Sequence, residues 1–180
     1  MKGAAADELD RAAVRRCLAG HGDAFGELVE RYQRPLYNVA LRMLHHVQDA
    51  EDVVQTAFVN AFLRLRTYDP KYRFYSWIYR MAVNGSLNAL KRRKTTVPLD
   101  NLPLRAEDAG ADRTLEAEDR VGRALMDLKP DDRAVVVLRH FVSFSYQEIA
   151  DVLEIPVRTV KSRLFTARDR LRDALRDPGR

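Results

Sequence analysis

The chain has 180 residues, of which 46 % are hydrophobic, enough to bury the core of one domain or of two small ones. A single cysteine, Cys17, excludes an intramolecular disulfide and a cysteine-rich zinc site, and the lack of any long apolar run predicts a cytoplasmic protein without membrane insertion. The net charge of +5 favours an acidic partner.

Helical spacing dominates the first third of the sequence. Glycine is scarce and no convincing alternating run of β-branched residues is present, so we expect an all-α protein. A first helix is expected over residues 7–19. Asp23 is expected to cap a second helix, and Pro35 to open a third, because proline suits the first turn of a helix.

A cluster of acidic residues opens the next predicted helix. Asp49 is expected to cap it, with Asp52 and Gln55 on its polar side. Carboxylates this close could bind a metal, but no histidine or further carboxylate stands at ligand spacing, so we expect no metal site and no cofactor. A patch at Asp52 and Gln55 that docks a protein partner is the alternative interpretation.

Residues 68–79 combine aromatic and basic side chains, and they begin within a loop predicted over residues 67–75. They hold six of the chain's fifteen aromatic residues, within a segment (residues 62–94) of net charge +8. Aromatic faces stack on unpaired bases and cations follow phosphates, so we expect this segment to bind single-stranded or opened nucleic acid. For Trp77, a place in the core is equally expected. A helix capped by Ser76 should continue to the basic residues 91–94.

The helical pattern fails over residues 95–117, which contain prolines and many acidic residues. We therefore predict two small helical domains, residues 1–94 and 118–180, joined by an extended acidic linker. Lys129-Pro130 should break the helical pattern that resumes after the linker, and another helix follows.

A helix-turn-helix is predicted near the C-terminus. Ser145 and Glu148 form a capping box for a short helix, Glu154-Ile155 makes the turn, and Pro156 suits the start of the second helix. That helix has an apolar stripe at Val160, Leu164, Ala167 and Leu171. Cationic and hydroxyl side chains lie off the stripe, as they do on helices that read the major groove.

Catalysis has no credible candidate in the sequence, so we do not expect an enzyme. Ser145, His140 and Asp151 do not form a catalytic triad, and no glycine-rich phosphate loop is present. Two rival interpretations are a stand-alone helix-turn-helix regulator and a nucleic-acid-modifying enzyme that uses the acidic cluster.

Taken in order, three segments resemble the bacterial RNA polymerase sigma factors, specifically their extracytoplasmic-function (ECF) group. Residues 49–62, DAEDVVQTAFVNAF, are similar to the family's polymerase-binding helix. Residues 74–94 resemble its −10 reading segment, and residues 145–171 resemble its −35 reading helix-turn-helix. The resemblance implies a factor that binds core RNA polymerase, directs it to promoters and promotes DNA melting.

The resemblance also implies partners and site residues. The partners are promoter DNA, the clamp coiled coil of the largest polymerase subunit, the flap of the second subunit, and an anti-sigma factor. The residues implied for polymerase binding are Asp52, Gln55 and Phe58. Those implied for the −10 element are Tyr72, Phe74, Tyr75, Trp77, Asn84, Lys91, Arg92 and Arg93. Those implied for the −35 element are Tyr146, Arg158, Thr159, Lys161, Ser162, Phe165 and Thr166.

Several positions depart from the family pattern. Thr56 stands where an acid is usual, and Thr166 where arginine is common, so one expected contact is altered at each. Glu154 and Arg158 replace common glycines. If Glu154 adopts a positive φ, the strain costs about 1 kcal/mol. Arg158 adds a candidate phosphate contact.

Overall fold

The computed structural model describes residues 4–96 and 113–176, with side chains for residues 5–93 and 120–176. This part of the chain is helical throughout, which confirms the all-α prediction. Its elements are α1 (Ala4–Leu18), η1 (Gly22–Ala24), α2 (Phe25–Leu44), α3 (Val47–Leu63), η2 (Leu65–Thr67), α4 (Phe74–Thr96), α5 (Arg113–Met126), α6 (Pro130–His140), α7 (Tyr146–Leu153) and α8 (Val157–Arg176).

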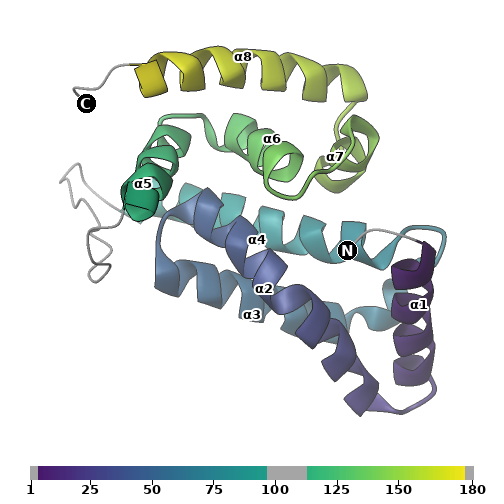
Figure 1. The fold of residues 1–180 in the computed structure, drawn as a ribbon. Coiled ribbons are helices and arrows are strands. Elements are labelled where there is room, and N and C mark those ends of the chain that lie inside the picture. Colours follow the sequence, from purple (N-terminus) through teal and green to yellow (C-terminus); the bar gives the residue numbers. More distant parts are fainter. Residues whose placement is uncertain (1–3, 97–112, 177–180) are drawn as a thin grey trace.

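The helices form two tiers. One tier holds α1–α4 and the other holds α5–α8, with α8 along its outer side (Figure 1). Most of the predicted linker falls on residues 97–112, which lie outside the described residues. The domain boundaries therefore stay a prediction.

Helix α2 runs without a break through Pro35, so the expectation that Pro35 opens a separate helix is wrong. Proline removes one backbone hydrogen bond and favours a kink. The buried stripe of Leu28, Tyr32, Leu36 and Val39 nevertheless continues across it, while Pro35 itself is exposed. Packing of this stripe therefore outweighs the local preference of proline.

Three predicted helix starts are also shifted. Asp23 lies in η1, and α2 begins at Phe25 without a side-chain cap. The cap of α3 is His46, whose Nδ1 accepts the Asp49 N–H at 3.2 Å, so Asp49 is not the cap. Helix α4 begins at Phe74, two residues before Ser76, which places Phe74 and Tyr75 in its first turn.

The helix-turn-helix matches its prediction closely. Ser145 and Glu148 form the reciprocal capping box, and α7 ends at Glu154, whose φ is 54°. Helix α8 begins at Val157, directly after Pro156. The break at Lys129-Pro130 is confirmed, with Pro130 as the first residue of α6.

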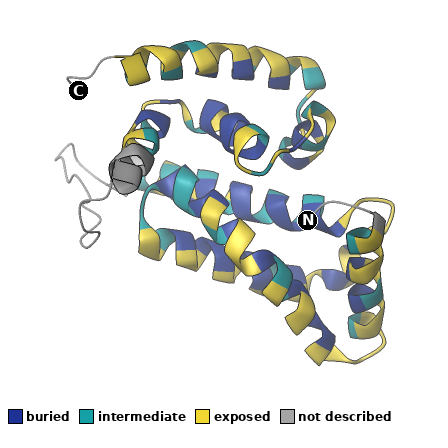
Figure 2. Cartoon of the chain, viewed as in Figure 1, coloured by how far each residue is buried: buried dark blue, intermediate teal, exposed yellow. Residues whose placement is uncertain are grey.

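One continuous hydrophobic core joins the two tiers. Most of the buried residues lie on the facing sides of the two tiers, whereas most of the exposed residues lie on their outer sides (Figure 2). Among the described residues, no helix combines the length and apolar character that crossing a membrane requires.

Arg133 of α6 makes several hydrogen bonds inside this core and links the two tiers. It is only 4 % exposed. Its guanidinium donates to the carbonyls of Leu125 (2.8 Å), Met126 (2.9 Å) and Leu128 (3.2 Å), and across the tiers to the carbonyl of Met43. Burial lowers its pKa to about 10. Arg133 thus satisfies carbonyls at the ends of α2 and α5 at once.

Candidate nucleic-acid interface

Helix α8 presents a polar outer face. Val160, Leu164 and Ala167 are at most 1 % exposed and face the tier's core. The opposite side carries most of the residues implied for the −35 element. Those that are exposed are Arg158, Lys161, Ser162, Phe165 and Thr166, whereas Thr159 and Tyr146 are half-buried. Phe165 is 71 % exposed, so its ring is accessible on this face.

Tyr146 is held at the start of α7 by Arg139. The Arg139 guanidinium lies 5.1 Å from the centre of the Tyr146 ring, and it donates to the Phe144 carbonyl at 2.9 Å. The capping box fixes the same end of α7. These contacts together hold the start of α7 against the end of α6.

The aromatic–basic segment divides into buried and exposed residues. Phe74 and Tyr75 are 2 % and 4 % exposed, so in this arrangement neither is open to a nucleic-acid strand, contrary to expectation. The cause is that α4 begins early and turns both rings into the core. Tyr72 is 61 % exposed and Asn84 is exposed. Both are accessible, as their implied role requires.

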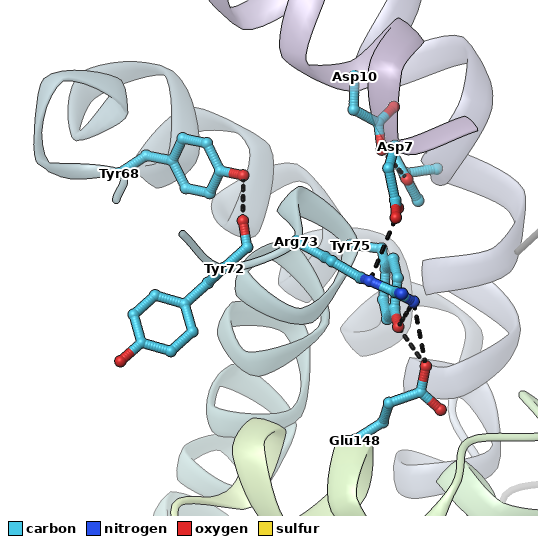
Figure 3. A network of polar contacts seen from close by, with 8 residues as sticks. Asp7, Asp10, Tyr68, Tyr72, Arg73, Tyr75 and Glu148 are labelled. Atoms are coloured by element: carbon cyan, nitrogen blue, oxygen red, sulfur yellow. Dashed lines mark hydrogen bonds and ion pairs between the residues drawn. The ribbon is translucent and has the colours of Figure 1, made fainter. Parts of the chain in front are cut away.

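Trp77 lies partly in the core, as one of its two interpretations predicts. It is half-buried, and its ring lies 5.3 Å from that of Tyr68 and 5.8 Å from that of Phe74. The Tyr68 hydroxyl donates to the Tyr72 carbonyl at 2.5 Å, which ties Tyr68 to the loop before α4 (Figure 3). Trp77 therefore packs against two rings of its own segment and is only partly accessible.

Tyr75 faces the other tier. Its hydroxyl accepts a hydrogen bond from Arg73 at 3.1 Å and donates to Glu148 of α7 (Figure 3). Burial, reinforced by the bond to Glu148, raises the Tyr75 pKa to about 12. Arg73 also pairs with Asp7 of α1, with 3.1 Å between Nε and Oδ2. Three helices thus converge on the loop between η2 and α4.

A cleft of about 1070 Å³ lies beside this loop. One wall is formed by the aromatic–basic segment, including Tyr72, Trp77 and Arg80, and the other by α7 and the start of α8. Cations and ring edges on the first wall suit a single strand, because rings stack on bases and cations neutralise phosphates.

The basic residues near the end of α4 are not equivalent. Arg93 is paired with Asp49 and donates to the Leu44 carbonyl at 3.3 Å, so it ties α4 to α3 and to the end of α2. Lys91 and Arg92 are exposed. They are the better placed of the three to meet a phosphate backbone.

Helix α3 exposes a mixed surface. Asp52 and Gln55 are exposed, as implied for polymerase binding. Phe58 is only 8 % exposed and makes an edge contact with Phe25 at 6.4 Å, so it belongs to the core and cannot dock a partner. The apolar side chains that α3 exposes beyond Gln55 are Val59 (52 %), Phe62 (49 %) and Leu63 (73 %). An acidic and apolar stripe therefore follows α3 to its end.

Sequence reasoning missed the long-range contacts of four charged residues. Arg73, Arg80, Glu148 and Arg133 each join elements distant in the chain, and their partners could not be read from local spacing. Among the described residues, no group of three or more His, Cys, Asp and Glu side chains converges as metal ligands do.

The two halves of the chain match two family descriptions. Residues 28–96 match "Sigma-70 region 2" and residues 118–171 match "Sigma-70, region 4". Helix α1 precedes the first match. The order of the matches follows the two tiers.

Similar curated proteins span nearly the whole chain. The ECF RNA polymerase sigma factor SigW of Bacillus subtilis is 31 % identical, over 91 % of this chain and 95 % of its own. The RNA polymerase sigma-H factor of Pseudomonas aeruginosa is 34 % identical, over 93 % and 94 %. The ECF RNA polymerase sigma-E factor of Escherichia coli is 34 % identical, over 89 % and 91 %.

Two solved structures share the fold. CnrH, in complex with the cytosolic domain of CnrY, has a TM-score of 0.74 and 29 % identity, over 93 % of this chain and 97 % of its own. The sigma factor RpoE of Bartonella quintana, in complex with the anti-sigma factor NepR, has a TM-score of 0.68 and 22 % identity, over 86 % and 98 %. The latter likeness concerns the fold alone.

Proposed function

Because the chain belongs to the ECF group of RNA polymerase sigma factors, we propose that its two tiers grip a promoter at two separate points while α3 docks on the polymerase. The observation that carries the proposal is the pairing of an exposed polar face on α8 with an aromatic–basic loop in the other tier. A stand-alone helix-turn-helix regulator would need only the second tier to bind DNA, and it would leave the aromatic–basic loop of the first tier without a role.

Helix α8 is the proposed −35 reader. Lys161, Ser162 and Thr166 lie where side chains can meet base edges in the major groove, and Arg158 is suited to a phosphate. Phe165 offers an apolar contact to a thymine methyl group. Tyr146 and Thr159, which are half-buried, border this face.

The loop before α4 is the proposed −10 reader. Tyr72 is the most exposed ring of the segment and is placed to stack on an unpaired base, while Trp77 supports it. Asn84, which lies further along α4, can hydrogen-bond a base edge. Lys91 and Arg92 lie further on and can contact the DNA phosphate backbone. Unstacking a base step costs a few kcal/mol, which stacking of about 1–3 kcal/mol per base offsets in part.

The docking surface for core polymerase is proposed on α3. It comprises Asp52 and Gln55 together with Val59 and Leu63, which follow them at helical spacing. Its partner is the clamp coiled coil of the largest subunit, and the second tier reaches the flap of the other large subunit. The factor itself is not an enzyme, since the polymerase performs the chemistry, and it works in the cytoplasm.

An anti-sigma factor is the proposed regulatory partner. RpoE of Bartonella quintana, which shares the fold, was solved with the anti-sigma factor NepR. The same surfaces that dock polymerase are open to such a protein. Pull-down from cells without the inducing stimulus should recover one, and its absence there counts against this part of the proposal.

The central test is transcription by purified core polymerase with and without the chain, on a library of promoter templates. Added initiation at a defined set of templates is expected only when the chain is present. If no template gains initiation, the proposal is wrong.

A further inference from the structure

The Arg73 guanidinium, in the loop before α4, is held from the side of α1. Its Nε lies 3.1 Å from Oδ2 of Asp7, and its Nη1 donates to the Tyr75 hydroxyl at 3.1 Å (Figure 3). Glu148 of the other tier lies 3.8 Å from Nη1. No described residue accepts a hydrogen bond from Nη2. The Arg73 side chain is 52 % exposed and therefore keeps donor capacity for a ligand.

Asp7 lies on the protein side of this guanidinium. Arg73 lines the cleft beside the loop, whereas Asp7 is not among the residues that line it. The Asp7 side chain is only 16 % exposed, much less than its partner. The pair therefore presents its cation to the cleft and keeps its carboxylate out of it. A carboxylate in this place orients the guanidinium without meeting the phosphates of a strand in the cleft.

Asp10 fixes the part of α1 that carries Asp7. It lies one turn further along, is 1 % exposed, and accepts hydrogen bonds from the Tyr32 hydroxyl at 2.5 Å and from Arg31. The Tyr32 ring packs on Phe74, with ring centres 5.8 Å apart. These contacts tie α1 to α2 and to the first residue of α4. Asp7 is therefore held in a defined place, as a group that positions another must be.

We propose that Asp7 is a positioning residue, which orients the Arg73 guanidinium toward the phosphates of the −10 strand. The inference rests on the proposed function, because the orientation matters only if a strand enters the cleft. A long arginine side chain loses rotamer freedom when it binds, and a partner that already holds Nε removes part of this cost. The remaining N–H groups, those of Nη2 among them, are left for a phosphate. Helix α1, which precedes the matched residues 28–96, thereby becomes part of the strand-binding unit.

Two explanations of Asp7 predict opposite effects of D7N on strand binding. If Asp7 acts only through its charge, removing the carboxylate raises the affinity for an anionic strand. If Asp7 positions Arg73, removing it lowers the affinity about two- to fivefold, the range of an exposed ion pair. The matched control is E8Q on the same helix. It removes the same charge, and the Glu8 carboxylate pairs instead with Arg15 at 2.8 Å.

The test uses holoenzyme assembled from core polymerase and each variant. The probe is a fluorescein-labelled oligonucleotide carrying the non-template −10 strand of a promoter found in the transcription test. R73Q should bind it about two- to fivefold more weakly than wild type, and the slope of log affinity against log salt concentration should fall by about 0.7 for the lost phosphate contact. D7N should bind at least about twofold more weakly than E8Q. D7N/R73Q should bind no more weakly than R73Q, because Asp7 acts through Arg73.

Three results would overturn the positioning role. The first is D7N holoenzyme that binds the strand as tightly as E8Q holoenzyme, or more tightly. The second is a loss that persists in full between R73Q and D7N/R73Q, because α1 then acts only as a structural element. The third comes from a duplex probe that carries the −35 element, which the other tier reads and all variants should bind equally. An equal loss of D7N on this duplex marks a global defect.

A ring variant separates failure of the positioning role from failure of the proposed function. Y72A removes the ring proposed to stack on a base and leaves Asp7 and Arg73 in place. If Y72A weakens strand binding while R73Q and D7N do not, the −10 reader stands and the positioning role is wrong. If wild-type holoenzyme does not bind the strand, the −10 assignment itself fails, and the positioning role fails with it.

Discussion

Replacing Arg133 with methionine should destabilise the whole chain more than any exposed substitution. Methionine has a similar length and fills the space, but it removes every donor that serves the carbonyls of Leu125, Met126, Leu128 and Met43. Removing one partner of a buried hydrogen bond leaves the other without water or protein to satisfy it.

The magnitude follows from these carbonyls. That of Leu125 also accepts the Leu128 N–H at 3.2 Å, so three carbonyls depend most on Arg133. Each buried acceptor left unsatisfied costs about 1–3 kcal/mol, and relief from burying a charge offsets part of the sum. We expect a net loss of about 3 kcal/mol, equivalent to about 6–12 °C in Tm for a chain of this size.

Thermal and urea unfolding followed by far-ultraviolet circular dichroism measure this loss. R133K should fall between wild type and R133M, because an ammonium cannot fork to several carbonyls. The control is R172M, which removes only an exposed pair with Asp169 on α8 and should cost less than about 0.5 kcal/mol. If R133M unfolds within 0.5 kcal/mol of R172M, the reasoning about carbonyl satisfaction is refuted.

Three further outcomes are expected. Burial raises the pKa of Tyr68, Tyr75 and Tyr79 to about 12, so between pH 10 and 12 the native state keeps phenol protons that the unfolded state has lost, and stability falls as pH rises. Arg133, whose pKa is lowered, opposes this trend because it loses one proton in the native state. Y79F should reduce the dependence of the unfolding free energy on pH by about 1.4 kcal/mol per pH unit. An unchanged dependence would contradict the raised pKa of Tyr79. L63S should weaken binding to core polymerase about 5- to 30-fold without changing Tm, unlike V47S at the other end of α3, and equal affinities of the two variants count against the docking stripe. T166R should change which −35 sequences the holoenzyme prefers. R158G should lower by about one the slope of log affinity against log salt concentration in holoenzyme titrations with promoter DNA. If neither the preference nor the slope changes, neither residue belongs to the interface.

The parts of the fold that were predictable are those fixed by neighbours in sequence. The capping box of Ser145 and Glu148 needs two residues three positions apart, and the buried stripe of α8 needs only helical spacing, so both were readable. Pro35 shows the limit of such signals. Proline locally favours a helix start, but the buried stripe of α2 packs on α3 and α4 and continues the helix through Pro35. The spacing of residues alone did not show which of these two effects is stronger.

The candidate site was predictable in type but not in exposure. Aromatic and basic residues were correctly expected together beside a loop, yet Phe58 and Tyr75 turned out to be buried. Phe58 is covered by Phe25 of the same tier, and Tyr75 by Phe144 of the other. A contact between residues some 70 positions apart has no local signature, so a helical stripe indicates which residues share a face but not what covers it.

Glu154 stands where the family commonly has glycine, and its backbone adopts a positive φ. Its φ of 54° is the left-handed conformation that glycine adopts without strain, so a side chain here costs about 1 kcal/mol. The pair with Arg80 returns about 0.2–1 kcal/mol, because the Glu154 side chain is 66 % exposed. The two effects nearly cancel, so E154G should leave Tm nearly unchanged in thermal unfolding. A Tm that rises by several degrees would show that Glu154 is merely a strained turn residue and that its pair with Arg80 contributes little.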